Sequence, residues 1–120
     1  MRRLFVIFLI GWLAVQAPPT GWLGLTVQEL TPQIAMRLGI RVMEGVFVAA
    51  VQPGSPADQG GIRAGDVIVS LNGKKISDPE ALRREVSKIS PGTSIEVALH
   101  RGRQEKKVKI WVGSPPREAV

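Results

Sequence analysis

The stretch "PGSPADQGGIRAGDVIVSLNG" (residues 53–73) places three structural signals close together in the chain. Pro53-Gly54 favours a turn, and Ser55-Pro56 is a common start for a short helix. The apolar run in "DVIVSL" predicts a strand, and Asn72-Gly73 at its end favours the left-handed backbone of a tight hairpin. The stretch therefore predicts a turn, a short helix and a strand that folds back on itself.

The chain before this stretch predicts a strand, a short helix and a second strand. Apolar residues alternate in "WLGLTVQ" (residues 22–28), which is typical of a strand. Thr31 is a helix N-cap residue, Pro32 suits the first helical position, and Gly39 marks the end of that helix. The run "GVFVAAVQ" (residues 45–52) is rich in residues that favour strands.

The chain after this stretch predicts its longest helix and then a hairpin. Asp78 can cap the free amides of a helix that begins at Pro79 and stops at "SPG" (residues 90–92). Two segments with strand-like alternation follow and are predicted to pair across "RGRQ" (residues 101–104): residues 95–99 and 108–112.

The length and composition indicate one ordinary domain. The chain has 120 residues, of which 44% are hydrophobic, and no cysteine, so disulfides, thiolate nucleophiles and cysteine-ligated metals are excluded. Lys and Arg exceed Asp and Glu by 16 to 10, and without Arg2 and Arg3 the basic count falls to 14. The positive surplus is modest, and it does not by itself indicate a nucleic-acid partner.

Four motifs in a fixed order carry a resemblance to a known family. They are "WLGL" at the head, "PGSPA", "AGDVIVSLNG", and the helix that ends at "PG". Together they resemble a PDZ domain of the bacterial HtrA type over residues 21–113, without the protease domain. The resemblance implies an α+β fold, a small, partly open antiparallel β-barrel or sandwich of five to six strands capped by two helices. It also implies the permuted bacterial strand order, with the ligand-binding strand first and the closing strand last.

The resemblance also implies a peptide-binding site at "WLGL". In a PDZ domain an extended peptide adds a strand to an open sheet edge, and consecutive backbone amides hold its terminal carboxylate. The amides of Leu23, Gly24 and Leu25, in the loop that begins at Trp22, are the expected donors. Glycine suits this loop because a side chain at the tightest position would obstruct the carboxylate. Thr26 and Val27 would then pair with the bound strand.

The opposite wall of this groove would be the helix that begins at Pro79. Leu82 and Val86 are one turn apart and share a face, so they either line the pocket for the last ligand side chain or belong to the core. Arg83 and Arg84 point in different directions, and one of them can overlook the groove. We assign Arg83 to the site.

The N-terminus has the layout of a secretory signal. Two arginines precede an uncharged apolar run over residues 4–15, which is shorter than a bilayer span. Val15 and Ala17 have the small-residue spacing of a cleavage site, but Pro18 would follow the cut directly. Residues 1–17 are therefore predicted to be a signal peptide or a retained anchor, before a domain over 18–113 and a tail over 114–120. The protein is expected to be exported, either periplasmic or anchored to the inner membrane and facing the periplasm.

The sequence predicts no catalytic residue, metal or cofactor. A Ser-His-Asp triad needs a histidine beside its nucleophile, and the one histidine, His100, is expected to face solvent next to a turn. Asp58 and Asp66 are expected in a turn and a loop, unpaired as an acid/base dyad. No "GxxxxGK[ST]" phosphate-binding loop is present.

The expected function is therefore a non-catalytic module that binds C-termini or extended segments of exported and envelope proteins, as an adaptor or sensor. A separate envelope protease is a candidate partner, and a retained anchor would associate the protein with the membrane. Two alternatives remain open. The groove is unused or permanently filled in an envelope complex, or a basic hairpin contacts anionic lipid through Arg101, Arg103, Lys106, Lys107 and Lys109. The chain's own end, "REAV", is a further candidate ligand for the groove.

Overall fold

The computed structural model describes residues 20–42 and 44–116. Three helices and six strands occur in this part of the chain. In chain order they are β1 (Leu25–Glu29), α2 (Pro32–Leu38), β2 (Val46–Val51), α3 (Pro56–Gly60), β3 (Val67–Leu71), β4 (Lys74–Lys75), α4 (Pro79–Ser87), β5 (Ser94–Arg101) and β6 (Gln104–Trp111).

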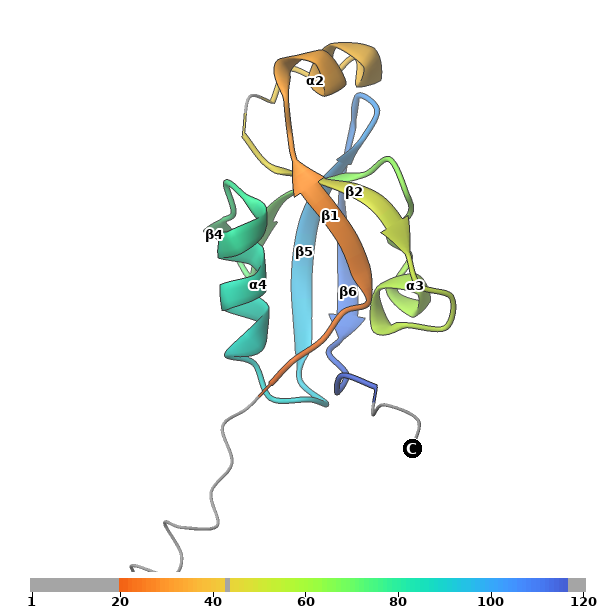
Figure 1. Ribbon diagram of the computed structural model, residues 1–120, viewed down its shortest axis with the longest axis vertical. Helices are drawn as coiled ribbons and strands as arrows, with labels where there is room; N and C mark the ends of the chain where they lie inside the picture. Colours follow the sequence, from red (N-terminus) through yellow and green to blue (C-terminus); the bar gives the residue numbers. More distant parts are fainter. Residues whose placement is uncertain (1–19, 43, 117–120) are drawn as a thin grey trace, which may run out of the picture.

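The strands form one antiparallel sheet in the order β1-β2-β3-β5-β6, with β4 paired to β3 outside this path. β1 and β6 are the two ends of the path, and a bridge between Trp22 and Gly113 brings the two ends together. Figure 1 shows α4 on one side of β1 and α3 on the other. The structure confirms the predicted small, partly open antiparallel fold with the first strand at its edge. The structure has one helix more than the two that the resemblance implied. The additional helix is α3, the short helix expected from Ser55-Pro56.

All three helices begin in the same way. A polar side chain accepts a hydrogen bond from the backbone N–H three residues later, and a proline occupies the first helical turn, where its missing N–H costs nothing. The capping bonds are Thr31 Oγ1 from Ile34 (3.2 Å), Ser55 Oγ from Asp58 (3.2 Å) and Asp78 Oδ1 from Ala81 (2.8 Å).

The β3–β4 hairpin turns at Asn72-Gly73, as the sequence predicts. Both residues have positive φ, 51° at Asn72 and 81° at Gly73, the backbone of a tight hairpin turn. Asn72 is also bound to β5, because its Oδ1 accepts from the Glu96 N–H at 2.8 Å and its own N–H donates to the Glu96 carbonyl at 2.7 Å. The turn therefore holds β4 beside the sheet.

Two apolar clusters lie on opposite faces of β2 and β3. Because side chains alternate along a strand, Val46, Val48 and Ile68 enter the main core, while Phe47 and Val67 pack with α2. The main core continues to α4, and the smaller cluster binds α2 to the sheet. The site described below is built over the main core.

A buried ion pair connects the loop before β3 to the end of β5. Asp66 is 1% exposed, and its two oxygens accept from Arg101 Nε at 2.9 Å and Nη2 at 2.8 Å. Arg101 Nη2 also donates to the Gly61 carbonyl at 2.8 Å. The hydrogen bonds to Asp66 raise the pKa of Arg101. Arg101 is therefore held by Asp66 and the Gly61 carbonyl and does not belong to a free basic cluster.

The N-terminal segment over residues 1–17 and the last residues of the tail lie outside the described residues. Among the helices of residues 20–42 and 44–116, none has the length and apolar character needed to span a membrane.

Candidate functional site

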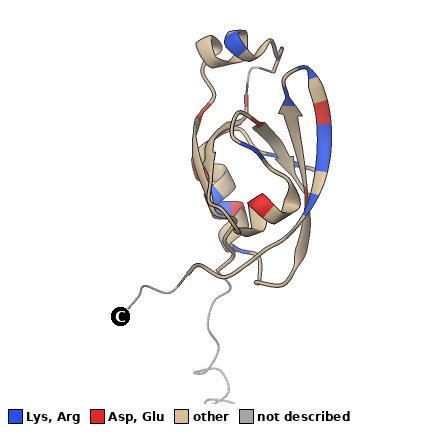
Figure 2. Cartoon of the chain, turned by 90° about the vertical axis from the view of Figure 1, so that its right-hand side faces the viewer, with Lys and Arg blue, Asp and Glu red and all other residues tan. Residues whose placement is uncertain are grey.

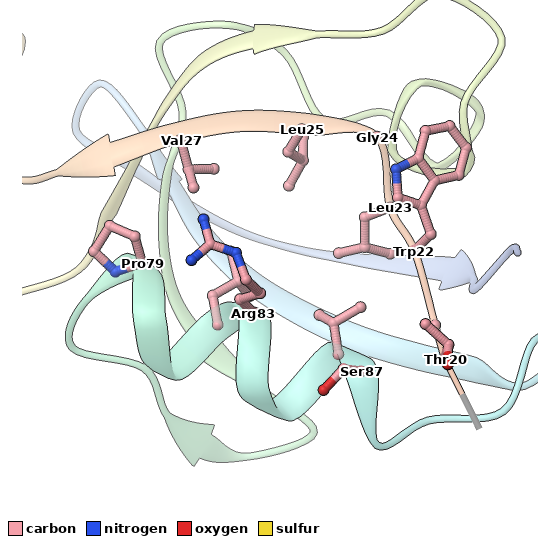
Figure 3. A pocket seen from close by; sticks show the side chains of 12 residues that line it. Thr20, Trp22, Leu23, Gly24, Leu25, Val27, Pro79, Arg83 and Ser87 are labelled. Carbon is pink, nitrogen blue, oxygen red and sulfur yellow. The ribbon is translucent and has the colours of Figure 1, made fainter. Parts of the chain in front are cut away.

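A groove lies between β1 and α4, with a cavity volume of about 270 Å³. Figure 3 shows the side chains of β1 on one side and those of α4 on the other. Twelve residues line the groove, and most are apolar: Thr20, Gly21, Trp22, Leu23, Gly24, Leu25, Val27, Pro79, Leu82, Arg83, Val86 and Ser87.

The groove borders an open edge of the sheet. β1 pairs with β2 through five residues, from Leu25 opposite Val51 to Glu29 opposite Val46. Within the described residues no strand pairs with its other side, which faces α4. An edge strand of this kind presents unpaired N–H and C=O groups to an incoming strand.

The loop over residues 22–25 closes one end of the groove, and the carbonyl groups of Leu23 and Gly24 are already used. The Leu23 carbonyl accepts from the Ala57 N–H at 3.0 Å, and the Gly24 carbonyl accepts from the Gln52 N–H at 2.9 Å. The N–H groups of Leu23 and Gly24 donate no hydrogen bond to any described residue. Two consecutive free amides that lie beside a groove can bind an anion.

Gly24 is required by both its backbone and its neighbours. Its φ is +83°, a region that residues with a side chain rarely adopt. A Cβ at this position would also collide with the Ser55 Cβ and lie 2.8 Å from its Oγ. The contact with Ser55 is thus a reason for glycine in addition to the space expected for a ligand carboxylate.

Gly21 brings the loop against the C-terminal end of α4. A Cβ there would collide with the Val86 carbonyl oxygen, and would lie 2.7 Å from Val112 Cγ1 and 2.8 Å from the Ile89 carbonyl oxygen. The chain therefore crosses the end of α4 at close range because Gly21 has no side chain. This contact places the C-terminal end of α4 next to the 22–25 loop and Pro79 at the far end of the groove, near Val27.

Leu82 and Val86 belong to both the core and the groove. They are 4% and 6% exposed and pack in the main core, and both also line the cavity. A role in the core and a role in the pocket are thus not exclusive for Leu82 and Val86. These two side chains form the apolar floor on which a ligand side chain could rest.

Arg83 lines the groove and Arg84 does not. Arg83 Nη1 lies 2.7 Å from Glu80 Oε1, and the two side chains are 70% and 76% exposed. In Figure 3 the Arg83 guanidinium extends across the groove toward Val27 and away from the 22–25 loop.

Of the nine residues assigned to the site from the sequence, eight line the groove, and the ninth, Thr26, lies in the edge strand β1 without lining the groove. Thr26 is exposed and does not line the cavity, because the alternation along β1 turns its side chain away from Leu25 and Val27. Sequence reasoning missed Thr20, Gly21, Pro79 and Ser87 as lining residues. Ser87 lies one helical turn after Arg83, so the helical period could have indicated it.

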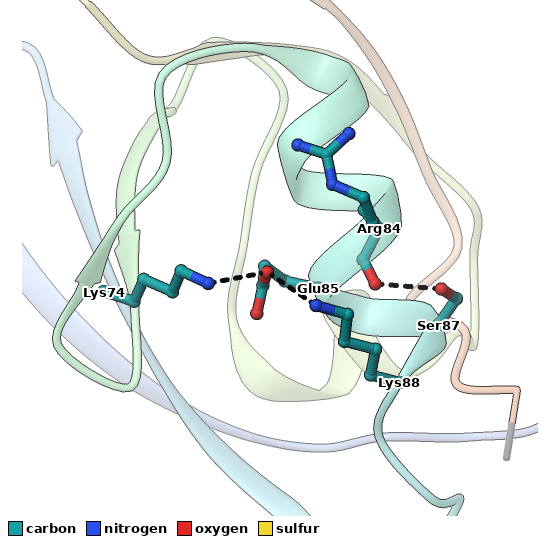
Figure 4. A network of polar contacts seen from close by, with 5 residues as sticks. All are labelled: Lys74, Arg84, Glu85, Ser87 and Lys88. Carbon is teal, nitrogen blue, oxygen red and sulfur yellow. Dashed lines mark hydrogen bonds and ion pairs between the residues drawn. The ribbon is translucent and has the colours of Figure 1, made fainter.

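Ionic contacts hold α4 to the β3–β4 hairpin. Glu85 Oε2 lies 2.9 Å from Lys74 Nζ and 3.4 Å from Lys88 Nζ, as Figure 4 shows. The hydrogen bond from Lys74 is the main cause that lowers the pKa of Glu85, against an opposing effect of desolvation, and Lys88 contributes further. These contacts fix the face of α4 that lies away from β1.

The remaining polar side chains named from the sequence have structural neighbours in the described residues. No group of three His, Asp or Glu residues that could bind a metal occurs in the described parts of the chain. His100 was expected to face solvent, but its side chain is only 19% exposed and its Nε2 lies 3.8 Å from Glu105 Oε2. Asp58 Oδ2 accepts from the Gly54 N–H at 2.7 Å and belongs to the turn before α3.

An acidic residue, Glu105, interrupts the basic residues of the β5–β6 hairpin along the chain. Figure 2 shows an acidic segment between the basic segments of this hairpin. Lys107 and Lys109 are exposed, whereas Lys106 is half-buried. Trp111 is 62% exposed, and Lys109 Nζ lies 5.6 Å from the centre of its ring.

A family model described as PDZ domain matches residues 21–112. This chain belongs to the PDZ domain family. The match covers the 22–25 loop, β1 and α4, so the groove lies inside the PDZ domain.

Curated relatives of this PDZ domain are named as proteases. A probable periplasmic serine endoprotease DegP-like of Rhizobium meliloti (strain 1021) is 39% identical over 99 residues, which are 82% of this chain and 20% of the relative. A protein of the same name from Ectopseudomonas mendocina (strain ymp) is 40% identical over 98 residues, 82% of this chain and 21% of the relative. The chain thus spans about one fifth of the length of these relatives.

Solved HtrA structures share the fold of this PDZ domain. The HtrA-type protease AlgW with decapeptide is 34% identical with a TM-score of 0.75, over 82% of this chain and 30% of that one. The HtrA3 PDZ domain bound to a phage-derived ligand (FGRWV) is 29% identical with a TM-score of 0.66, over 77% of this chain and 84% of that one. Both of these solved proteins carry a peptide, and this chain has a PDZ domain of the same HtrA type.

Proposed function

We propose that this PDZ domain captures the C-termini or extended segments of exported proteins, by adding them as a strand to β1. The observation that carries the proposal is the open edge of β1, which borders an apolar groove and leads to the free N–H groups of Leu23 and Gly24. An extended peptide can form backbone hydrogen bonds with the unpaired groups of that edge, while its terminal carboxylate accepts hydrogen bonds from the two amides.

This arrangement sets the direction of the ligand. The carboxylate lies at the 22–25 loop, from which β1 runs away, so the bound strand is antiparallel to β1. Its last side chain then rests on Leu82 and Val86, whose buried apolar surface favours an apolar terminal residue. The solved HtrA structures with peptides support the same mode of use.

The proposal places the protein in the periplasm as a non-catalytic adaptor or sensor. The curated relatives are named periplasmic endoproteases, and the residues matched here are a PDZ domain. A separate envelope protease is the enzyme that such a module would serve. Retention of the N-terminal segment would add an inner-membrane anchor.

The test is a calorimetric titration of the full 120-residue chain, in a mild non-ionic detergent, against pairs of peptides that differ only at the terminus. Each pair has one free acid and one C-terminal amide, and the last residue is Val, Ala, Ser or Lys. We expect binding of the free acids that end in Val or Ala, and its loss on amidation. Equal binding of acid and amide would refute the role of the 22–25 loop. Absence of binding by every peptide would favour a groove that is unused or permanently filled.

A further inference from the structure

Arg83 is the one ionisable side chain among the twelve residues that line the groove. The other lining side chains are apolar or carry a hydroxyl group, and the floor is formed by buried leucine and valine. A single cation over an apolar groove can distinguish ligands by charge at one position of the peptide. The position it reads follows from the geometry of the groove.

The groove has a fixed polarity. The C-terminal end of α4 lies against Gly21, directly before the 22–25 loop, since a Cβ on Gly21 would collide with the Val86 carbonyl, and Pro79 lies at the same end of the groove as Val27. α4 is thus antiparallel to β1. A ligand whose carboxylate is at the loop places its last residue beside Val86 and earlier residues toward Arg83 and Pro79.

The spacing of strand and helix then identifies the ligand residue that meets Arg83. Alternate side chains of an extended strand point the same way and are about 7 Å apart. Arg83 begins about 4.5 Å from Val86 along the helix axis, since each helical residue rises about 1.5 Å. Its guanidinium extends farther in the same direction, toward Val27. The second side chain that faces α4, two residues before the C-terminus, therefore lies beside the guanidinium.

We propose that Arg83 makes this groove select ligands with Asp or Glu two residues before the C-terminal residue. The inference rests on the proposed function, and it names the ligand class of the same site. The guanidinium fork matches a carboxylate in a bidentate geometry, and it is always charged at physiological pH. The apolar groove around it leaves the ligand carboxylate with no other charged partner inside the lining.

Glu80 is the competing partner of Arg83. The pair is an i, i+3 contact at 2.7 Å between two exposed side chains, so it is weak and can exchange with a ligand carboxylate. Removing the Glu80 charge frees the guanidinium. Glu80→Gln is therefore expected to increase the preference for an acidic ligand.

The experiment titrates the full chain with free-acid peptides that all end in Val and carry Asp, Asn, Ala or Lys two residues earlier. We expect the Asp peptide to bind about three- to tenfold more tightly than the Asn and Ala peptides, and the Lys peptide to bind most weakly. Arg83→Ala should remove this order, so that the Asp, Asn and Ala peptides bind the variant with similar affinity. Thermal unfolding of each variant checks that the fold is retained.

Arg84→Ala is the matched control, because it removes the same charge from the next residue, which does not line the groove. It should keep the preference for Asp. If both arginine variants reduce the preference equally, long-range charge explains it and the inference is wrong. If Arg83→Ala weakens all free-acid peptides equally, Arg83 contacts the terminal carboxylate instead, which also overturns it.

The outcomes separate this inference from the proposed function. Equal affinity for Asp, Asn and Ala peptides, together with loss of binding on C-terminal amidation, would overturn the role of Arg83 and leave the peptide-binding function intact. Failure of every free-acid peptide to bind would overturn both. Raising the salt concentration should reduce the preference for Asp and leave the affinity of the Ala peptide nearly unchanged.

Discussion

Gly24→Ala tests how the 22–25 loop is built. The substitution places a methyl group on a backbone with φ of +83° and drives it into Ser55. The left-handed backbone costs about 1–2 kcal/mol for a residue with a Cβ. The collision adds an overpacking cost of about 1–3 kcal/mol, because Ser55 is itself 3% exposed and has little room to move.

The sum is a loss of about 2–5 kcal/mol in the free energy of unfolding, a large part of the 5–15 kcal/mol typical of a domain. Peptide affinity should fall with the stability, since the shift moves the amides that we propose bind the carboxylate. The assay is urea unfolding followed by circular dichroism, with peptide titration of the same samples.

Combining Ser55→Gly with Gly24→Ala separates the cost of the left-handed backbone from the cost of overpacking. Ser55→Gly removes the side chain that the new methyl group meets, and glycine at a helix N-cap costs only a few tenths of a kcal/mol relative to serine. The double variant should recover about 1–3 kcal/mol relative to Gly24→Ala and retain the backbone cost of about 1–2 kcal/mol. Strictly additive effects of the two substitutions would refute the contact as the reason for glycine.

Three further predictions concern the residues around the site. Arg101→Ala leaves the Asp66 carboxylate buried without its cation and should lower the free energy of unfolding, measured with urea, by about 2–3 kcal/mol. This loss is smaller than that expected for a fully buried ion pair, because Arg101 is 27% exposed. Glu85→Gln should lower the free energy of unfolding at neutral pH. Because folding lowers the pKa of Glu85 below about 4.5, the difference in stability between variant and wild type should vanish as the pH falls through that lowered pKa. Urea unfolding at several pH values measures this difference. Val27→Ala should weaken peptide binding about threefold through lost apolar contact, whereas Thr26→Ala, on the other face of β1, should leave the titration unchanged.

Local signals account for the parts of the fold that the sequence could predict. The Thr31, Ser55 and Asp78 caps, each followed by proline, lie within a few residues of the groups that they satisfy. The Asn72-Gly73 turn likewise depends on its own backbone preference. These features need no tertiary information, so the order of the elements and the starts of the helices followed from the sequence.

The remaining features depend on contacts between distant segments. The pairing of Asp66 with Arg101 joins residues 35 positions apart, and neither residue carries a local signal of the other. The collision that requires Gly24 involves Ser55 on a different element. The sequence offered no physical reason for assigning Arg83 instead of Arg84, because adjacent helical residues differ by about 100° in direction and only the placement of β1 decides which one meets the groove.

The central claim is that the Leu23 and Gly24 amides hold a ligand's terminal carboxylate, and their proton resonances test it most directly. A two-dimensional ¹⁵N–¹H spectrum of the labelled chain would be recorded with a Val-ended free-acid peptide and with its C-terminal amide. The account predicts large downfield shifts of the Leu23 and Gly24 amide protons with the free acid, and small ones with the amide. Saturable binding of the free acid that leaves both resonances in place would contradict it.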